Sequence, residues 1–121
     1  MPGPLIDTTT QGLAATLTLH QRRQDILAAN IANVDTPGFR AHDLDFKKAL
    51  GEAFDAATEQ REAQPATVLE DDTMPAKADG NTVDLDLEMT KLGANGGRYV
   101  ALAKILGKRV ALLRQAIEGV R

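Results

Sequence analysis

Three acidic residues at two-residue steps, Asp84, Asp86 and Glu88, are the group in this sequence that most resembles a metal site. An EF-hand calcium loop needs alternating oxygen donors over about twelve residues and a glutamate at its end. That spacing is absent here. The three acids are better explained as the start of a helix, where negative charge complements the helix dipole.

Other catalytic chemistry also lacks its residues. His20 and His42 lie outside any His-x-x-x-His or histidine–carboxylate cluster, which argues against a zinc site. Cysteine is absent, so neither a disulfide framework nor thiolate chemistry is expected. No glycine-rich phosphate loop follows an expected strand, and no nucleophile–base pair is evident. We therefore expect no enzyme activity, no catalytic residue, no metal and no cofactor.

The charges are separated along the chain. Residues 70–88 carry seven acidic side chains and one basic one, whereas residues 91–121 carry seven basic side chains and one acidic one. This order complements the dipole of a helix, and it would also bring opposite charges together in subunits stacked head to tail. Nucleic-acid binding is not expected, because the net charge is −3 and only 3% of the residues are aromatic, which leaves few rings for base stacking.

A helix of unusual length is predicted near the C-terminus. Apolar or small residues recur there at alternating steps of four and three, which is the a/d spacing of a coiled coil. These seam residues are Leu85, Met89, Leu92, Gly96, Tyr99, Ala103, Leu106, Val110, Leu113, Ile117 and Val120. One helix over residues 84–119 is about 54 Å long, whereas a compact chain of this size is roughly 35 Å across. The chain is therefore expected to be an elongated part of an assembly, with the seam as a contact surface.

The rest of the pattern predicts an all-α fold in a single domain. Long N- and C-terminal helices are expected to pair antiparallel as an elongated, coiled-coil-like pair, with a short helix and an irregular loop between them. Within the domain 1–121, the parts are 1–34 for the N-terminal helix, 35–83 for the turn, short helix and loop, and 84–121 for the C-terminal helix. No run of about 18 apolar residues occurs, so no membrane-spanning helix is expected.

Capping signals predict where the first two helices begin. Thr8 and Gln11 have the spacing of a capping box at the start of the N-terminal helix. Asp43 is expected to cap the short helix, over residues 43–58. The stretch Thr67–Leu69 could form a short strand, but we expect it to be mostly loop.

A motif of paired asparagines and a proline–glycine turn follows the first helix. Its residues are Asn30, Asn33, Thr36, Pro37, Gly38, Phe39, Asp43, Asp45 and Phe46. Together with the block Asp79–Met89 and the pair Arg98-Tyr99, this motif resembles the bacterial flagellar axial proteins, the rod and hook family. The second block favours the proximal-rod members of that family. The resemblance covers about half of the chain, at its two ends.

This resemblance implies a structural subunit of the proximal rod, the driveshaft that links the inner-membrane ring to the distal rod and hook. It implies contacts with other rod subunits, with the adaptor at the ring–rod junction, and with copies of the chain in a helical assembly; contact with the ring itself stays open. It also implies a place in the basal body, export by the flagellar type III system without a cleavable signal peptide, and no membrane insertion. Two alternatives remain: a sister axial protein such as the C-type rod subunit, and a generic coiled-coil scaffold or secretion adaptor.

Some motif residues carry their own expectations. The amides of Asn30 and Asn33 are expected to bond to neighbouring helices and fix their register, with exposed or capping asparagines as the alternative. Gly38 is expected to adopt a positive φ in the turn. Phe46 and Leu50 match a Phe-x-x-x-aliphatic motif that rod and hook subunits use at the export gate, although one apolar helix face explains the same spacing.

One departure from the family pattern lies just before Arg98-Tyr99. The family has a bulkier, more helix-favouring run there, whereas this chain has Asn95-Gly96-Gly97, with Gly93 two residues earlier. Each glycine inside a helix costs roughly 0.5–1 kcal/mol relative to alanine. A close approach, a kink or a break of the C-terminal helix is therefore expected here, and the sequence leaves all three open.

Overall fold

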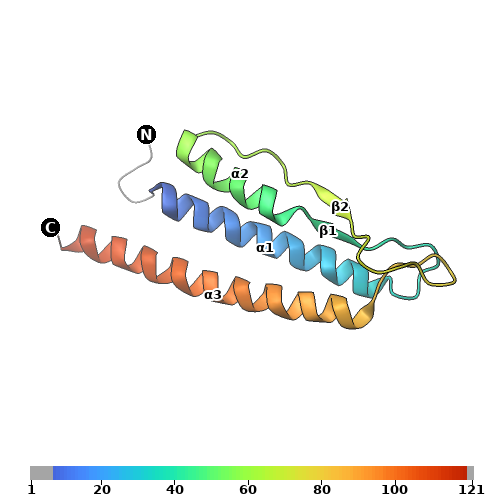
Figure 1. The fold of residues 1–121 in the computed structure, drawn as a ribbon. Coiled ribbons are helices and arrows are strands. Elements are labelled where there is room, and N and C mark those ends of the chain that lie inside the picture. The colour runs from blue at the N-terminus through green and yellow to red at the C-terminus, as the bar shows by residue number, and fades with distance from the viewer. Residues whose placement is uncertain (1–6, 120–121) are drawn as a thin grey trace.

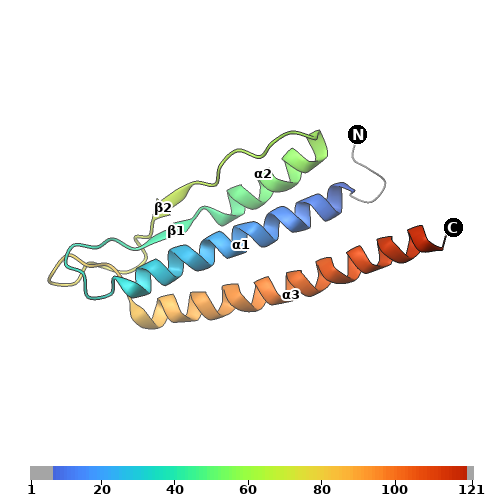
Figure 2. The same cartoon turned by 180° about the vertical axis from the view of Figure 1, so that it is seen from behind.

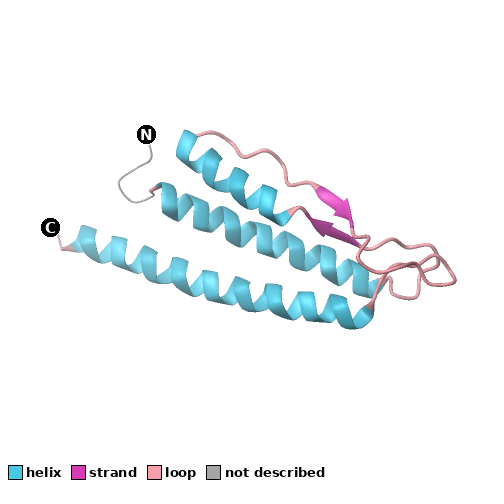
Figure 3. Ribbon diagram, in the orientation of Figure 1, coloured by secondary structure: helices cyan, strands magenta, loops and turns pink. Residues whose placement is uncertain are grey.

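Three helices form most of the protein, with one small strand pair beside them (Figures 1 and 3). The computed structural model describes residues 7–119, so the expectations for Val120 and for the other residues before 7 and after 119 lie outside the described residues. The elements, in order, are α1 (Thr8–Ala32), β1 (His42–Leu44), α2 (Phe46–Glu59), β2 (Val68–Glu70) and α3 (Leu85–Glu118). The predicted helical fold, with long helices toward both ends, is confirmed.

Helix α1 lies between the other two helices. It packs against α3 on one side and against α2 on the other, and Figures 1 and 2 show all three running side by side. Within the described chain, α3 therefore has α1 as its one extensive helical neighbour, and most of its surface faces outward.

The start of α1 is capped one residue earlier than predicted. Asp7 is the N-cap, and its Oδ1 accepts a hydrogen bond from the Thr10 backbone N–H at 2.8 Å. The expected capping box of Thr8 and Gln11 is therefore wrong, because a carboxylate, which is a good acceptor for first-turn N–H groups, stands just before Thr8.

The predicted cap of the short helix is also wrong. The N-cap of α2 is Asp45, whereas Asp43 lies in β1, opposite Leu69 of β2 in an antiparallel pair. The expected loop at residues 67–69 is thus partly strand. The signal for this pairing lies in a partner more than twenty residues away, so the local sequence did not reveal it.

Small residues allow α2 to approach α1 closely. The buried positions of α2 are Ala49, Ala53 and Ala56, and the ring of Phe54 lies where a Cβ on the buried Gly12 of α1 would be. Phe46, Leu50, Phe54 and Ala57 of α2 are half-buried along the edge of this contact.

A matched pair of alanine substitutions tests this close approach. Gly12→Ala should destabilise the fold by about 1–3 kcal/mol, because the Phe54 ring must move aside. Gly51→Ala, on the exposed side of α2 with no atom within 4 Å of the new Cβ, should instead stabilise it by about 0.5–1 kcal/mol. Urea unfolding of both variants measures the difference, and equal effects would contradict the packing described.

The glycines of α3 do not interrupt it. The helix runs continuously from Leu85 to Glu118, so the expectation of a break is wrong. An added Cβ at Gly96 would meet Gln24 Nε2 at an ordinary 3.6 Å, and at Gly93 or Gly97 it would meet nothing within 4 Å. These glycines therefore do not mark a close approach of two backbones either.

Candidate functional site

The contact between α1 and α3 is polar where it is most deeply buried. Asn95 of α3 is fully buried; its Nδ2 donates to His20 O at 2.8 Å and to Gln24 Oε1 at 2.7 Å. Its Oδ1 lies 2.7 Å from Nδ1 of His20, which is also buried. Three hydrogen bonds thus fix this point of α3 against α1, one residue before the predicted seam position Gly96.

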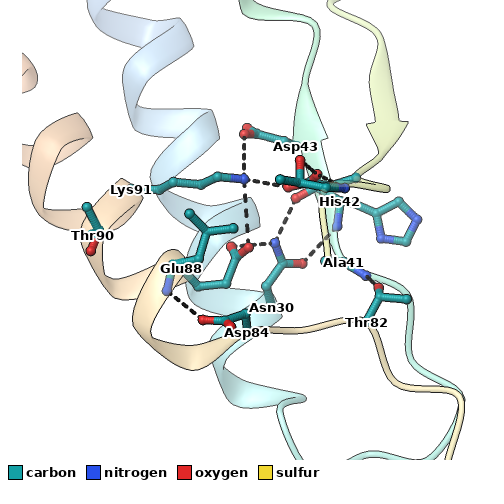
Figure 4. A network of polar contacts seen from close by, with 12 residues as sticks. Asn30, Ala41, His42, Asp43, Thr82, Asp84, Glu88, Thr90 and Lys91 are labelled. Carbon is teal, nitrogen blue, oxygen red and sulfur yellow. Dashed lines mark hydrogen bonds and ion pairs between the residues drawn. The ribbon is translucent and has the colours of Figure 1, made fainter. Parts of the chain in front are cut away.

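A second polar contact joins the motif asparagine to α3. Asn30 is 1% exposed, and its Nδ2 donates to His42 O at 2.7 Å and to the buried Glu88 Oε2 at 2.9 Å. Its Oδ1 accepts from the His42 N–H at 3.1 Å. Figure 4 shows this amide between β1 and α3. Asn33 is instead the C-cap of α1, and its Nδ2 donates to Ala29 O within the same helix.

An ionic cluster surrounds this contact. Lys91 Nζ pairs with Asp71, and lies 3.6 Å from Asp43 Oδ2 and 3.8 Å from Glu88 Oε1 (Figure 4). Arg23 of α1 holds the carboxylate of Asp43 with two bonds, at 2.8 and 2.9 Å. The cluster thereby links α1, β1, α3 and the loop after β2.

A third contact lies at the other end of the helix pair. Arg109 Nε donates to Thr10 Oγ1 at 2.8 Å, and its Nη2 donates to Asp7 Oδ2 at 2.6 Å. The three α3 positions that make these contacts, Glu88, Asn95 and Arg109, are separated by multiples of seven residues. They therefore fall on one heptad position, where a polar residue specifies register at some cost in stability.

The two sequence blocks that carry the family resemblance meet in space. Asn81 is fully buried; its Nδ2 donates to Asn33 O at 2.9 Å and to Thr36 O at 2.8 Å, and its Oδ1 accepts from Val83 N at 2.7 Å. Gly38 has φ +73°, as predicted, and its N–H donates to Asp79 O at 2.9 Å. Hydrogen bonds thus hold the proline–glycine turn against the loop that leads into α3.

The predicted seam is only partly used within the chain. Leu92, Gly96, Tyr99, Ala103, Leu106 and Leu113 are half-buried, whereas Leu85, Met89, Val110 and Ile117 are exposed. Three large apolar residues of α3 off the seam, Val100, Ile105 and Leu112, are exposed too. Apolar surface therefore remains on α3 beyond its contact with α1.

The comparisons with known proteins agree with the motif. The profile of the family described as "Flagella basal body rod protein" matches residues 12–40. The chain is 33% identical to the flagellar basal body rod protein FlgB of Salmonella typhimurium, over 85% of this chain and 88% of the relative. It is also 33% identical to FlgB of Aeromonas hydrophila, over 85% and 87%, and 35% identical to FlgB of Yersinia enterocolitica, over 78% and 82%.

The chain belongs to the FlgB family of flagellar basal body rod proteins. Its function is therefore that of a structural subunit of the flagellar rod, and it is not an enzyme. The family also locates the chain in the flagellar basal body rod.

The rod-family motif residues are placed at different depths. Asn30 is buried, Phe39 is half-buried with its ring 6.2 Å from that of His42, and Thr36 and Pro37 are exposed in the turn. Phe46, from the suggested export motif, packs its ring 4.6 Å from the ring of His20. Its partner in that motif, Leu50, is half-buried.

The sequence analysis missed most of the polar contacts just described. Asn81, Asn95, Arg23 and Lys91 were not singled out, and Glu88 was explained only as a helix-start acid. A signal was present for Asn95, which is a polar residue directly beside the seam position Gly96. For the ionic cluster no local signal exists, because its members come from four separate segments.

The described residues contain neither a cluster of metal ligands nor a membrane-spanning helix. In residues 7–119, no three His, Asp or Glu side chains gather as metal ligands would. Over the same range, none of the helices combines the length and apolarity needed to span a bilayer.

Acid should weaken the rod subunit through its ionic cluster. Burial raises the pKa of Asp71, but hydrogen bonds from Lys91 and Thr73 outweigh it and lower that pKa from 3.8 to about 2. A carboxyl with a lower pKa in the folded state stabilises the fold above its unfolded pKa, and this stabilisation is lost as the pH falls. The free energy of unfolding should therefore decrease from about pH 4 to about pH 2.

The matched variant is Asp71→Asn. It should be less stable than the parent at neutral pH and should show a shallower fall in acid, since one titrating group is gone. Denaturant unfolding at a series of pH values measures this. If the free energy of unfolding fell equally steeply with acid in the variant, Asp71 would not contribute to the pH dependence. The cap residue Asp7 would then account for the acid sensitivity, because hydrogen bonds from Thr10 and Arg109 also lower its pKa to about 2.

Proposed function

We propose that this subunit takes its place in the proximal part of the rod by packing the outer surface of α3 against neighbouring rod subunits. The observation that carries the proposal is the distribution of exposed large apolar residues. Of the nine in the described chain, seven lie on α3: Leu85, Met89, Val100, Ile105, Val110, Leu112 and Ile117. An apolar surface of this extent is typical of a protein–protein contact.

The apolar residues flank both sides of the α1 contact. At 3.6 residues per turn, Ile105 and Leu112 fall on one side of the line through Asn95 and Leu113, and Met89 falls on the other. A subunit with different contact surfaces on its two sides can form open helical assemblies, since heterologous contacts need not close. Copies of the chain, other rod subunits and the ring–rod junction adaptor would be the neighbours.

Charge contributes less to this packing than the sequence suggested. Much of the acidic block is used inside the chain: Glu70 pairs with Arg40, Asp71 pairs with Lys91, and Asp84 caps α3. Fewer acidic groups are therefore available for head-to-tail attraction between subunits. Apolar contact would contribute most of the free energy of packing between subunits.

The export motif, Phe46 and Leu50, would be recognised before the subunit folds. Phe46 lies against His20 and beneath the guanidinium of Arg23, 5.7 Å from the ring centroid. Docking of Phe46 at an export gate would therefore require α2 to be released from α1, or not yet packed. An unfolded chain presents Phe46 and Leu50 without that cost.

The decisive experiment places a charge on the most exposed apolar residue of α3. Leu112 is 65% exposed, so Leu112→Asp should leave the isolated subunit folded. In the rod, an unpaired charge at an apolar contact costs several kcal/mol, and every copy repeats the cost. We expect normal levels of protein, loss of motility and few basal bodies with complete rods.

The control is Gln115→Asp, which adds the same charge to an exposed polar position three residues away. It should leave rods and motility near normal. Complete rods at the parental frequency with Leu112→Asp, scored by electron microscopy, would show that this side of α3 faces solvent in the rod.

A further inference from the structure

The small sheet has one edge that α1 covers. His42 of β1 bonds the side chain of Asn30 through both its backbone N–H and its backbone C=O. These two groups point away from β2, because the backbone bonds of an antiparallel strand alternate between its two sides. The Asn30 amide therefore occupies the edge of β1 where a further strand could otherwise pair.

The opposite edge, on β2, is open. The C=O of Thr67 accepts from the Asp45 N–H at 2.9 Å, so the backbone groups of Thr67 face β1 and those of Val68 face away. The same alternation turns the N–H and C=O of Glu70 outward. Within residues 7–119, these four groups have no hydrogen-bond partner. Figures 1 and 3 show β2 on the outside of the molecule, with β1 between it and α1.

We propose that the open edge of β2 pairs with β2 of a second copy, antiparallel, about a two-fold axis at Leu69. In this register Val68 exchanges two backbone bonds with Glu70 of the second copy, and the reverse, so that all four open groups are bonded. An axis at Val68 would bond only half of them, and an axis at Glu70 would place two like charges opposite each other. The two Leu69 side chains, each 48% exposed in the single chain, face each other across the axis.

Charge complementarity favours a second copy as the occupant. In this register Asp72 of one copy lies opposite Ala66 of the other. Ala66 lines a groove together with Lys47 and Lys48, which are exposed and have no ion-pair partner within residues 7–119. The Asp72 side chain is 80% exposed and lies 3.9 Å from Arg40, so it is free to approach these lysines. The two-fold axis repeats the contact at the other end of the strand pair.

This contact is separate from the one proposed for α3. A contact about a two-fold axis closes after two copies, so it cannot extend a helical rod. Strand β2 also lies on the far side of α1 from α3 (Figures 1 and 2). The edge-paired dimer is therefore a form of the free subunit before assembly, and it stands or falls independently of the rod contact.

Cysteine substitution tests the register, because the chain has no cysteine of its own. At Leu69 the two copies form a non-hydrogen-bonded pair, whose Cα atoms lie about 4.5 Å apart, within the range of a disulfide. The control position is Val68, which is similarly exposed, at 40%. It is offset from its counterpart by two residues, or about 7 Å along the strands, and the strand spacing takes the pair beyond disulfide range.

Leu69→Cys should form the disulfide between two chains about ten times faster than Val68→Cys under mild oxidation. Non-reducing electrophoresis measures both rates, and circular dichroism checks that both variants stay folded. Equal rates would overturn the proposal, since they would show chance collisions of two exposed thiols.

A charge exchange tests the second copy directly. Every chain also carries Leu112→Asp, so that the apolar surface of α3 does not add its own association. One variant then carries Asp72→Lys, and the other carries Lys47→Glu with Lys48→Glu. Each variant alone repels its own copy, whereas a mixed dimer has opposite charges at both contacts.

Sedimentation velocity from about 10 µM to about 1 mM protein covers the range of a weak dimer. We expect dimers of the chain with Leu112→Asp alone, fewer dimers of either charge variant alone, and recovery of dimers in their equimolar mixture. A chain with Leu112→Asp alone that stays monomeric throughout would overturn the proposal. A mixture that associates no better than its components would overturn it as well.

Discussion

Asn30→Leu should lower the free energy of unfolding by about 3–5 kcal/mol, because it removes three hydrogen bonds, one of them to the buried carboxylate of Glu88. The amide of Asn30 bonds both the N–H and the C=O of His42, and also the carboxylate of Glu88. Leucine would leave all three groups without this partner, and Glu88 is only 1% exposed. Urea unfolding followed by circular dichroism measures the loss.

Asn33→Leu is the matched control, three residues further on. Its amide bonds Ala29 O within α1 and accepts from Thr36 Oγ1 at an exposed position, where water can replace either partner. We expect a loss of less than about 1 kcal/mol. Similar losses for the two variants would mean that Asn30 does not connect α1 to β1 and α3 as described.

The division of the chain into helices was predictable from local pattern. The apolar periodicity gave the two long helices, and the proline–glycine turn gave the end of the first. Some residues of the a/d repeat, such as Met89 and Ile117, are exposed beyond the contact with α1. Such features depend on residues within a few turns of each other, which is the range that sequence periodicity reports.

The functions of individual polar residues were less predictable. Asn30 and Asn33 are the same residue type three positions apart. Asn30 is buried between elements, whereas Asn33 caps α1. Glu88 has the position of an ordinary helix-start acid, but its carboxylate is buried against Asn30. The difference comes from β1 and α3 closing over one turn of α1, which is a long-range event that spacing does not encode.

Helix α3 also inverts the usual arrangement of polar and apolar residues. Its buried residues are Glu88 and Asn95, whereas residues such as Met89 and Leu112 are exposed. Buried polar contacts specify one register but add less stability than apolar packing. We infer that the contacts inside the subunit set the position of α3, and that its apolar surface is kept for the contacts that build the rod.

The second large effect is expected at Asn81, whose side chain joins the proline–glycine turn to the loop before α3. Asn81→Leu should lower the free energy of unfolding by about 2–4 kcal/mol, because Asn33 O, Thr36 O and the Val83 N–H lose their buried partner. The matched control is Lys77→Leu. Lys77 Nζ donates to Val34 O of the same turn, but at an exposed position, so its loss should cost less than about 0.5 kcal/mol.

Amide exchange distinguishes a local loss of the contact between the turn and the loop before α3 from general destabilisation. In Asn81→Leu, the amides of Gly38 and Val83 should exchange faster than those of α2, because the turn and the loop before α3 no longer hold each other. In Lys77→Leu both should stay protected. If exchange in Asn81→Leu rose equally in the turn and in α2, the asparagine would be acting on the whole fold, and the two blocks would have no separate contact to lose.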